Sequence, residues 1–175
     1  NGQTTVLSNS AIGQNNYIIN TGKCISVKGN LEIDKNFLFQ GGEIRMHPGA
    51  SITLPSNGNY KLSFYETSPA TIDIHGCGIM WLGTNVNNNQ LSVKNAIIHD
   101  AENAISCSNN SKLRIESSTF TNNWVGLRLA SSNFLLGSME AFISATTFQG
   151  FGTMNAAYTP GLSSNLPLNK PYTGI

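Results

Sequence analysis

Apolar and polar residues alternate in short runs along much of the chain, and clusters of Asn, Ser and Gly separate the runs. Residues 91–94 read Leu, Ser, Val, Lys, and residues 113–116 read Leu, Arg, Ile, Glu. Alternation with a period of two is the signature of a β-strand with one covered face. The polar clusters, such as residues 87–89, suit tight bends because Asn, Ser and Gly tolerate left-handed backbone. The pattern therefore predicts many short strands joined by tight turns.

These runs also repeat. Residues 111–132 match residues 89–110 at an offset of 22, and the apolar positions are the ones that are kept. The matched pairs are Leu91 with Leu113, Val93 with Ile115, Ile98 with Phe120, Ala104 with Gly126, Ile105 with Leu127, and Cys107 with Leu129. Residues 142–148 copy residues 114–120 at an offset of 28, which predicts that about six inserted residues near 133–140 bulge as a loop.

A repeat of this length indicates a solenoid, in which each unit buries its apolar side by stacking on its neighbours. Leucine-rich repeats need a stricter Leu and Asn framework, and helical repeats are longer and rich in Ala, Leu, Glu and Lys. This chain is rich in Asn, Ser, Thr, Ile and Gly instead. We therefore predict an all-β, right-handed parallel β-helix with coils of about 19–28 residues and irregular terminal caps.

The predicted β-helix occupies residues 1–175 as a single domain. Residues 1–24 are expected to form an N-terminal cap, residues 25–148 the coils, and residues 149–175 an irregular segment that ends before further coils. Charged residues make up 11% of the chain and the net charge is +1, which argues against a nucleic-acid groove or an anionic-membrane patch. No apolar run approaches the ~20 residues that span a bilayer.

Stacking also predicts columns of outward-facing residues. In the register proposed from the sequence, Asp73, Ser92 and Arg114 form one column, and His75, Lys94 and Glu116 form the next. Two interpretations are open: ion pairs between neighbouring strands, or a strip that binds a sugar or another ligand. The candidate ligand-binding residues are therefore Asp73, His75, Lys94, Arg114 and Glu116.

Other residue types point mainly to structural roles. Trp81 and Trp124 each stand two residues before a Gly, at Gly83 and Gly126, and are expected to fill space at the same bend of two coils. Cys107 falls in a core position.

For the remaining cysteines, Cys24 and Cys77 are a possible disulfide pair. The three histidines, at 47, 75 and 99, are expected at non-equivalent positions and not to share a metal. Residues 100–102, Asp-Ala-Glu, offer two carboxylates as a calcium candidate at a turn.

The stretches GGEIRMHPGASITL (41–54), CGIMWLG (77–83), AIIHDAENAISC and STFTNNWVGL together resemble the pectin-lyase-like β-helix region of large secreted bacterial surface proteins. Many proteins of this kind are exported by the type IX secretion system. The resemblance implies an extracellular or cell-surface location, the secretion machinery as a partner, and further C-terminal domains. Calcium-dependent lyases and paired-Asp hydrolases share the fold, but the three Asp residues, at 34, 73 and 100, form no Asp-Asp or Asn-X-Asp pair.

We therefore expect a β-helical structural or adhesion module that binds polysaccharide or cell-envelope components, with no catalytic residue and no metal ligand assigned. The alternative is a polysaccharide lyase or glycoside hydrolase whose active site lies outside this segment or is incomplete in it. A third interpretation, a purely architectural segment without any ligand, is also open.

Overall fold

The computed structural model of the protein describes residues 4–7, 16–19, 24–108, 110–129, 140–151 and 154–159. This part of the chain forms three sheets of six strands each, and every strand pair in them is parallel. Sheet A contains β1 (Thr4–Leu7), β4 (Asn30–Ile33), β7 (Ser51–Leu54), β10 (Trp81–Asn87), β13 (Ala101–Ser108) and β16 (Val125–Leu129). Sheet B contains β2 (Asn16–Ile19), β5 (Asn36–Gln40), β8 (Lys61–Tyr65), β11 (Gln90–Lys94), β14 (Lys112–Glu116) and β17 (Glu140–Ser144). Sheet C contains β3 (Cys24–Val27), β6 (Gly42–Met46), β9 (Ile72–Gly76), β12 (Ala96–His99), β15 (Thr119–Thr121) and β18 (Thr147–Gln149).

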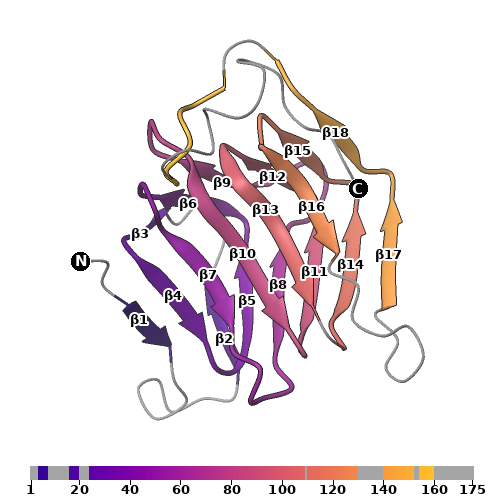
Figure 1. Ribbon diagram of the computed structural model, residues 1–175. Coiled ribbons are helices and arrows are strands. Elements are labelled where there is room, and N and C mark those ends of the chain that lie inside the picture. The colour runs from indigo at the N-terminus through magenta and orange to yellow at the C-terminus, as the bar shows by residue number, and fades with distance from the viewer. Residues whose placement is uncertain are drawn as a thin grey trace.

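The chain visits sheets A, B and C in turn and then begins the next coil, so that each strand pairs with the strands three places before and after it. Figure 1 shows the three sheets as the faces of one continuous winding. The predicted right-handed parallel β-helix is therefore confirmed.

The predicted stacking register is confirmed for the central coils. Leu91 pairs with Leu113 and Val93 with Ile115 in sheet B, and Ile98 pairs with Phe120 in sheet C. In sheet A, Ile105 pairs with Leu127 and Cys107 with Leu129. The copy at an offset of 28 is also correct, because Arg114 pairs with Phe142 and Phe120 with Phe148. The loop predicted near 133–140 falls mostly on residues outside the described part of the chain.

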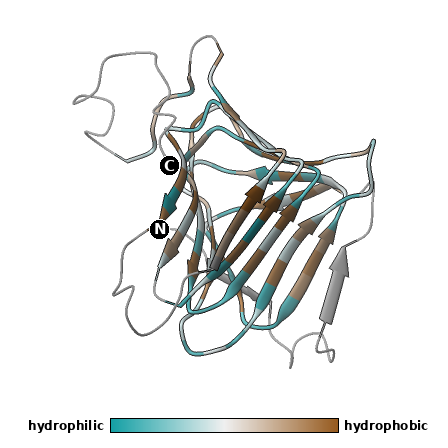
Figure 2. Ribbon diagram, turned by 90° about the vertical axis from the view of Figure 1, so that its right-hand side faces the viewer, coloured by the Kyte–Doolittle hydropathy of each residue, from teal (hydrophilic) through white to brown (hydrophobic). Residues whose placement is uncertain are grey.

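Inward-facing side chains form ladders along the axis of the coil. In sheet B, the ring of Phe39 contacts that of Phe64 in a tilted arrangement with centroids 5.4 Å apart, and Phe64 is followed by Val93. Figure 2 shows how hydrophobic and hydrophilic residues alternate along the strands. Because like residues lie on like at the ~4.8 Å spacing of strands, the core is continuous from coil to coil.

Single left-handed residues make the sharp corners between sheets B and C. Asn95, Ser117 and Ala145 occupy this corner in three successive coils, with φ of 51°, 48° and 47°. Asn88, at a corner between sheets A and B, has φ of 56°, as expected for the Asn cluster at 87–89. The polar clusters therefore act as the predicted bends wherever the structure describes them.

The expected N-terminal cap, residues 1–24, contains β1 and β2, which pair with β4 and β5. Two details differ from the sequence prediction. Coil length varies more widely than 19–28 residues, because Ser51 pairs with Gly83, 32 positions later. The two tryptophans are not equivalent, because a bulge after Gly83 shifts the register of β10 on β13 by one residue.

Both tryptophans nevertheless pack at the start of a coil. Trp81 is fully buried, and its indole Nε1 donates a hydrogen bond to the carbonyl oxygen of His99 at 3.0 Å. Trp124 is half-buried directly before β16, and its backbone N donates to the carbonyl of Ala101 at 2.8 Å. The structural interpretation of Trp81 is confirmed, and its burial leaves it no face for a sugar.

Candidate functional site

The outer face of sheet B carries a shallow groove of about 480 Å³. Its walls are two rows of outward-facing residues on neighbouring strands, Lys61, Gln90 and Lys112 in one row and Ser92, Arg114 and Phe142 in the other. Leu91 and Leu113, which lie between the rows, are buried, so the floor consists mainly of backbone. The groove is therefore flat, open and long rather than a closed pocket.

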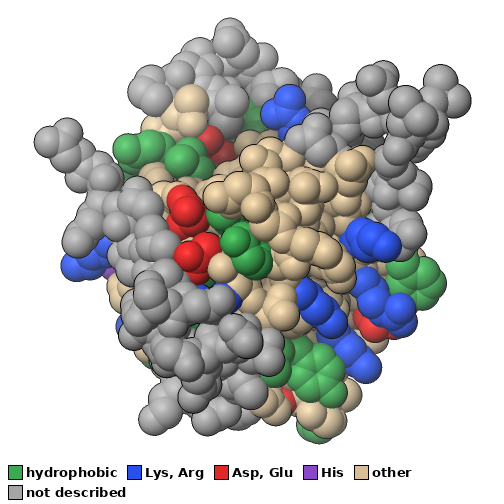
Figure 3. All heavy atoms as spheres, turned by 90° about the horizontal axis from the view of Figure 1, so that it is seen from below, with side chains coloured by type: hydrophobic (Ala, Val, Ile, Leu, Met, Phe, Trp, Pro, Cys, Tyr) green, Lys and Arg blue, Asp and Glu red, His purple; other side chains and the backbone are tan. Residues whose placement is uncertain are grey.

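Positive charge is concentrated on this face. Four of the ten Lys and Arg residues of the chain lie here, namely Lys61, Lys94, Lys112 and Arg114. Among the side chains that the structure describes on this face, these cations outnumber the carboxylates, of which Glu116 is one. Seen from below, Lys and Arg side chains gather along one side of the molecule (Figure 3). The overall net charge of +1 gave no sign of this clustering.

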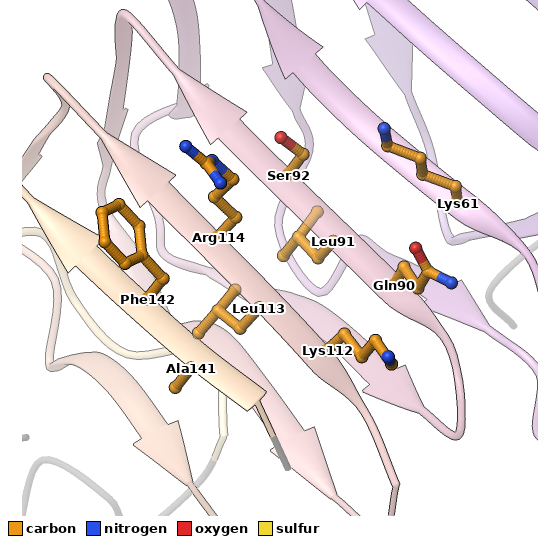
Figure 4. Close-up of a pocket in the computed structure, with 9 residues that line it drawn as sticks. All are labelled: Lys61, Gln90, Leu91, Ser92, Lys112, Leu113, Arg114, Ala141 and Phe142. Carbon is orange, nitrogen blue, oxygen red and sulfur yellow. The ribbon is translucent and has the colours of Figure 1, made fainter. Parts of the chain in front are cut away.

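Arg114 is held in place from two sides. Its guanidinium donates to both carboxylate oxygens of Glu116, at 3.0 and 2.8 Å, and lies 4.8 Å from the centroid of the Phe142 ring. The hydrogen bonds from Arg114 lower the pKa of Glu116 below its usual value. Phe142 is 49% exposed, so its ring and the adjacent guanidinium offer a flat surface beside the groove (Figure 4).

The sequence-predicted columns are right for part of this face only. Ser92 pairs with Arg114 and Lys94 with Glu116, as predicted. Asp73 and His75 are not in these columns, because they belong to β9 of sheet C and pair with Ile97 and His99. The period-two pattern is the same in all three sheets, so it could not tell which strand of a coil a run belongs to.

Asp73 and His75 instead belong to a row of ionisable residues on the outer face of sheet C. His75 and His99 are direct neighbours in the register, and their rings stack with centroids 5.1 Å apart. The expectation that the histidines occupy non-equivalent positions is therefore wrong for this pair. His47 lies apart, hydrogen-bonded to the hydroxyl of Ser26 at 2.8 Å.

Each imidazole of the pair contacts a carboxylate of a neighbouring coil or corner. His75 Nε2 lies 2.8 Å from Glu43 Oε1, and Arg45 contacts the same carboxylate at 2.6 and 2.9 Å. Hydrogen bonds from Arg45 and then from His75 lower the pKa of Glu43 to about 2. His99 lies between Asp100, 2.6 Å from Nδ1, and Asp73, 3.1 Å from Nε2. The row therefore links three successive coils by polar side chains.

The environment of His99 makes a pH-dependent contribution to stability. Partial burial alone lowers the pKa of His99, but hydrogen bonds to Asp100 and then Asp73 outweigh it and raise the pKa to about 9. Because the folded pKa lies above the unfolded value, this stabilisation is complete below about pH 6.5 and is lost as the pH rises through 9.

We expect His99→Gln to lose about 1–2 kcal/mol of unfolding free energy at pH 6 and much less at pH 9.5, after allowance for solvent screening. Urea unfolding of the native protein and the variant at both pH values measures this difference, and other titrating groups cancel in the comparison. Asp100→Asn, which removes the nearer carboxylate, should weaken the same pH dependence. An equal loss at both pH values would contradict the role given to the His99 charge.

The remaining candidate residues have protein partners or lie too far apart. Cys24, Cys77 and Cys107 are all free thiols, so the predicted disulfide is absent. Cys24 is in register with Glu43 and Asp73, whereas Cys77 lies four positions beyond Asp73. The two strand spacings between β3 and β9 alone amount to about 9.6 Å, whereas a disulfide needs Cα atoms within about 7 Å. Burial raises the pKa of Cys107 to about 12, in keeping with its predicted core position.

The two carboxylates of the calcium candidate are separated by their hydrogen bonds. Asp100 contacts His99, whereas buried Glu102 accepts hydrogen bonds from the backbone N and the hydroxyl of Thr159, at 2.5 and 2.6 Å. Among the described residues, no group of three or more His, Cys, Asp or Glu side chains is arranged to hold a metal ion.

Comparisons with protein-family models, with curated proteins and with solved structures gave no significant match for this chain. Within the described ranges, no helix has the length and apolarity needed to cross a bilayer. The groove on sheet B is the feature of this structure that best indicates a function.

Proposed function

We propose that this β-helix is a secreted or cell-surface binding module, and that the groove on the outer face of sheet B binds an acidic polysaccharide. The observation that carries the proposal is that Lys61, Lys112 and Arg114 line one long, open groove, with Lys94 on the same face of the sheet. The surface location and export by the type IX secretion system form part of the proposal and rest on the sequence resemblance alone.

The shape of the groove favours an extended polymer over a small molecule. Small-molecule sites are usually concave and enclose most of their ligand, whereas this groove has a flat backbone floor and runs across several strands. Lys61 on β8 and Lys112 on β14 lie two strand spacings apart, or about 9.6 Å, with Gln90 of β11 between them. A chain that lies across the strands would therefore meet two cations, one on each side of Gln90.

The other groups at the groove suit sugars in particular. The exposed face of Phe142, backed by Arg114, is suitable for stacking against the apolar face of a pyranose ring. The hydroxyl of Ser92 and the amide of Gln90 can exchange hydrogen bonds with sugar hydroxyls. Carboxylate or sulfate groups on the polymer would pair with the cations, as oppositely charged surfaces do in other complexes.

Binding to dextran sulfate and to uncharged dextran of equal length tests the proposal. We expect the native protein to bind dextran sulfate much more tightly than dextran, with an affinity that falls as salt rises. Lys61→Ala/Arg114→Ala should weaken binding by about tenfold or more and make the salt dependence less steep.

The matched control is Lys28→Ala/Arg128→Ala, which removes the same charge from exposed positions outside sheet B. This variant should bind nearly as well as the native protein. Equal losses in the two double variants would show that net charge, rather than the groove, causes the binding. Equal affinity for dextran and dextran sulfate, or binding to duplex DNA as tight as to dextran sulfate, would also contradict the proposal.

A further inference from the structure

A second, smaller groove lies at the corner between sheets A and B, next to the groove of the proposed function. Its volume is about 250 Å³, and its lining consists of Asn59, Asn88, Asn89, Gln90, Asn110 and Lys112. Gln90 and Lys112 also line the groove on sheet B, so the two hollows adjoin. Figure 3 looks toward this corner and shows a broad uncharged surface beside the Lys and Arg side chains.

One of these amides, that of Asn89, stabilises the backbone of the corner. Asn89 is buried, its Nδ2 donates to the carbonyls of Pro55 and Asn87 at 2.7 and 2.6 Å, and its Oδ1 accepts from the backbone N of Tyr60 at 2.6 Å. All the strong hydrogen bonds of this amide are therefore internal. They tie two successive coils together and fix the backbone on which the neighbouring amides stand.

The exposed amides keep hydrogen-bonding groups for a ligand. Asn110 is exposed and makes no side-chain hydrogen bond within the described part of the chain. Asn59 is exposed, and its Oδ1 accepts a long 3.5 Å hydrogen bond from Gln90 Nε2, which leaves Asn59 Nδ2 as a donor and Gln90 Oε1 as an acceptor. Donors and acceptors therefore stand side by side at this corner.

This chemistry matches an uncharged sugar residue. A hydroxyl group donates one hydrogen bond and accepts up to two, and a side-chain amide offers both a donor and an acceptor as partners. Lys112 is the only ionisable residue among those that line the corner groove, and it stands where that groove joins the one on sheet B. A bound polymer would thus run along the cations of the groove on sheet B and then over the neutral amides of the corner groove.

We infer that the amide-lined corner is a second subsite, which binds an uncharged sugar next to an acidic sugar held on sheet B. This inference rests on the proposed function and narrows its ligand class to acidic heteropolysaccharides in which charged and uncharged residues alternate. The amides of the corner would form hydrogen bonds with the uncharged sugar. They would suit a polymer that is charged at every sugar less well.

Two polymers of equal length and known composition test the inference. Hyaluronan alternates carboxylated and uncharged sugars, whereas polygalacturonate carries a carboxylate on every sugar. We expect the native protein to bind hyaluronan more tightly than polygalacturonate. Asn59→Ala/Asn110→Ala should weaken hyaluronan binding by about 5- to 20-fold, as expected for a few lost hydrogen bonds. The steepness of the salt dependence should not change, because every cation remains.

The matched control is Asn85→Ala, which removes an exposed amide from the outer face of sheet A and should leave hyaluronan binding unchanged. Native-like affinity of the double corner variant for hyaluronan would overturn the inference. So would binding of the native protein to polygalacturonate or dextran sulfate without binding to hyaluronan, and in that case the proposed function would still stand. Failure of the native protein to bind any acidic polymer would overturn both.

Discussion

Replacement of Gly83 by alanine is expected to destabilise the β-helix by on the order of 3 kcal/mol, through backbone strain and a steric clash together. Gly83 has φ of +115°, a conformation that residues with a Cβ atom rarely adopt. A Cβ atom added there would lie 1.6 Å from the backbone carbonyl oxygen of Asn103. Because the obstacle is backbone of the paired strand β13, a side-chain rotation cannot relieve it.

The site of this clash also explains the size of the effect. Gly83 is the residue after which β10 shifts its register on β13, so that Thr84 pairs with Ile105. If β10 and β13 could not approach each other closely at Gly83, β10 would be displaced. The next residue of β10, Thr84, stands in register between Ile52 and Ile105 in the core. The free energy of unfolding from urea titration, followed by circular dichroism, is the measurement.

Gly78→Ala separates backbone strain from steric conflict. Gly78 also has positive φ, +81°, but an added Cβ would meet no atom within 4 Å. We therefore expect a loss of only about 1 kcal/mol for this variant. Equal losses at the two positions would show that the contact with Asn103 adds nothing beyond strain.

The sequence was sufficient for the fold because stacking places like residues on like. The pair Leu91 and Leu113 could be predicted from the offset of 22 alone, and the structure contains it. The bulge at Gly83 could not be predicted, because a one-residue shift in register leaves the pattern of apolar residues on either side unchanged. The offset of 43 between the tryptophans therefore hid a change of register.

The candidate site was predicted less completely than the fold. Lys94, Arg114 and Glu116 were correctly placed on one face, and the offset of 28 set Phe142 on Arg114, whereas Lys61 and Gln90 were not connected with this face. A signal for Lys61 does exist, since Leu-Ser-Phe at 62–64 parallels Leu-Ser-Val at 91–93. The connections at 66–71 and 77–80, which flank β9, lengthen this coil to an offset of 29 and conceal the match from a search at an offset of 22.

The row on sheet C was missed for a related reason. Asp73 and Asp100 are far apart in the sequence and have different backbone roles, one in β9 and the other at the corner after β12. Both nevertheless contact His99, because one strand spacing separates β9 from β12 and Asp100 directly follows His99. Such a cluster becomes visible only when the coil length is known for each turn separately.

Replacement of Phe64 by alanine is expected to destabilise the protein by about 3–5 kcal/mol. The Phe64 side chain is fully buried and stands in register between Phe39 and Val93. Its ring is 5.4 Å from that of Phe39, so its removal leaves a cavity and also breaks an aromatic pair. Because the ladders and the strand pairs run through successive coils, we expect one cooperative urea transition at a lower midpoint.

Phe142→Ala is the matched control, because Phe142 lies in the same sheet but is 49% exposed. Its loss removes the contact with the Arg114 guanidinium and little core packing, so we expect a change of about 0.5–1 kcal/mol. A loss for Phe64→Ala no larger than that for Phe142→Ala would show that the stacked interior can close around a missing ring. In that case the stability of the coil would come chiefly from strand pairing, and the ladder of side chains would contribute little.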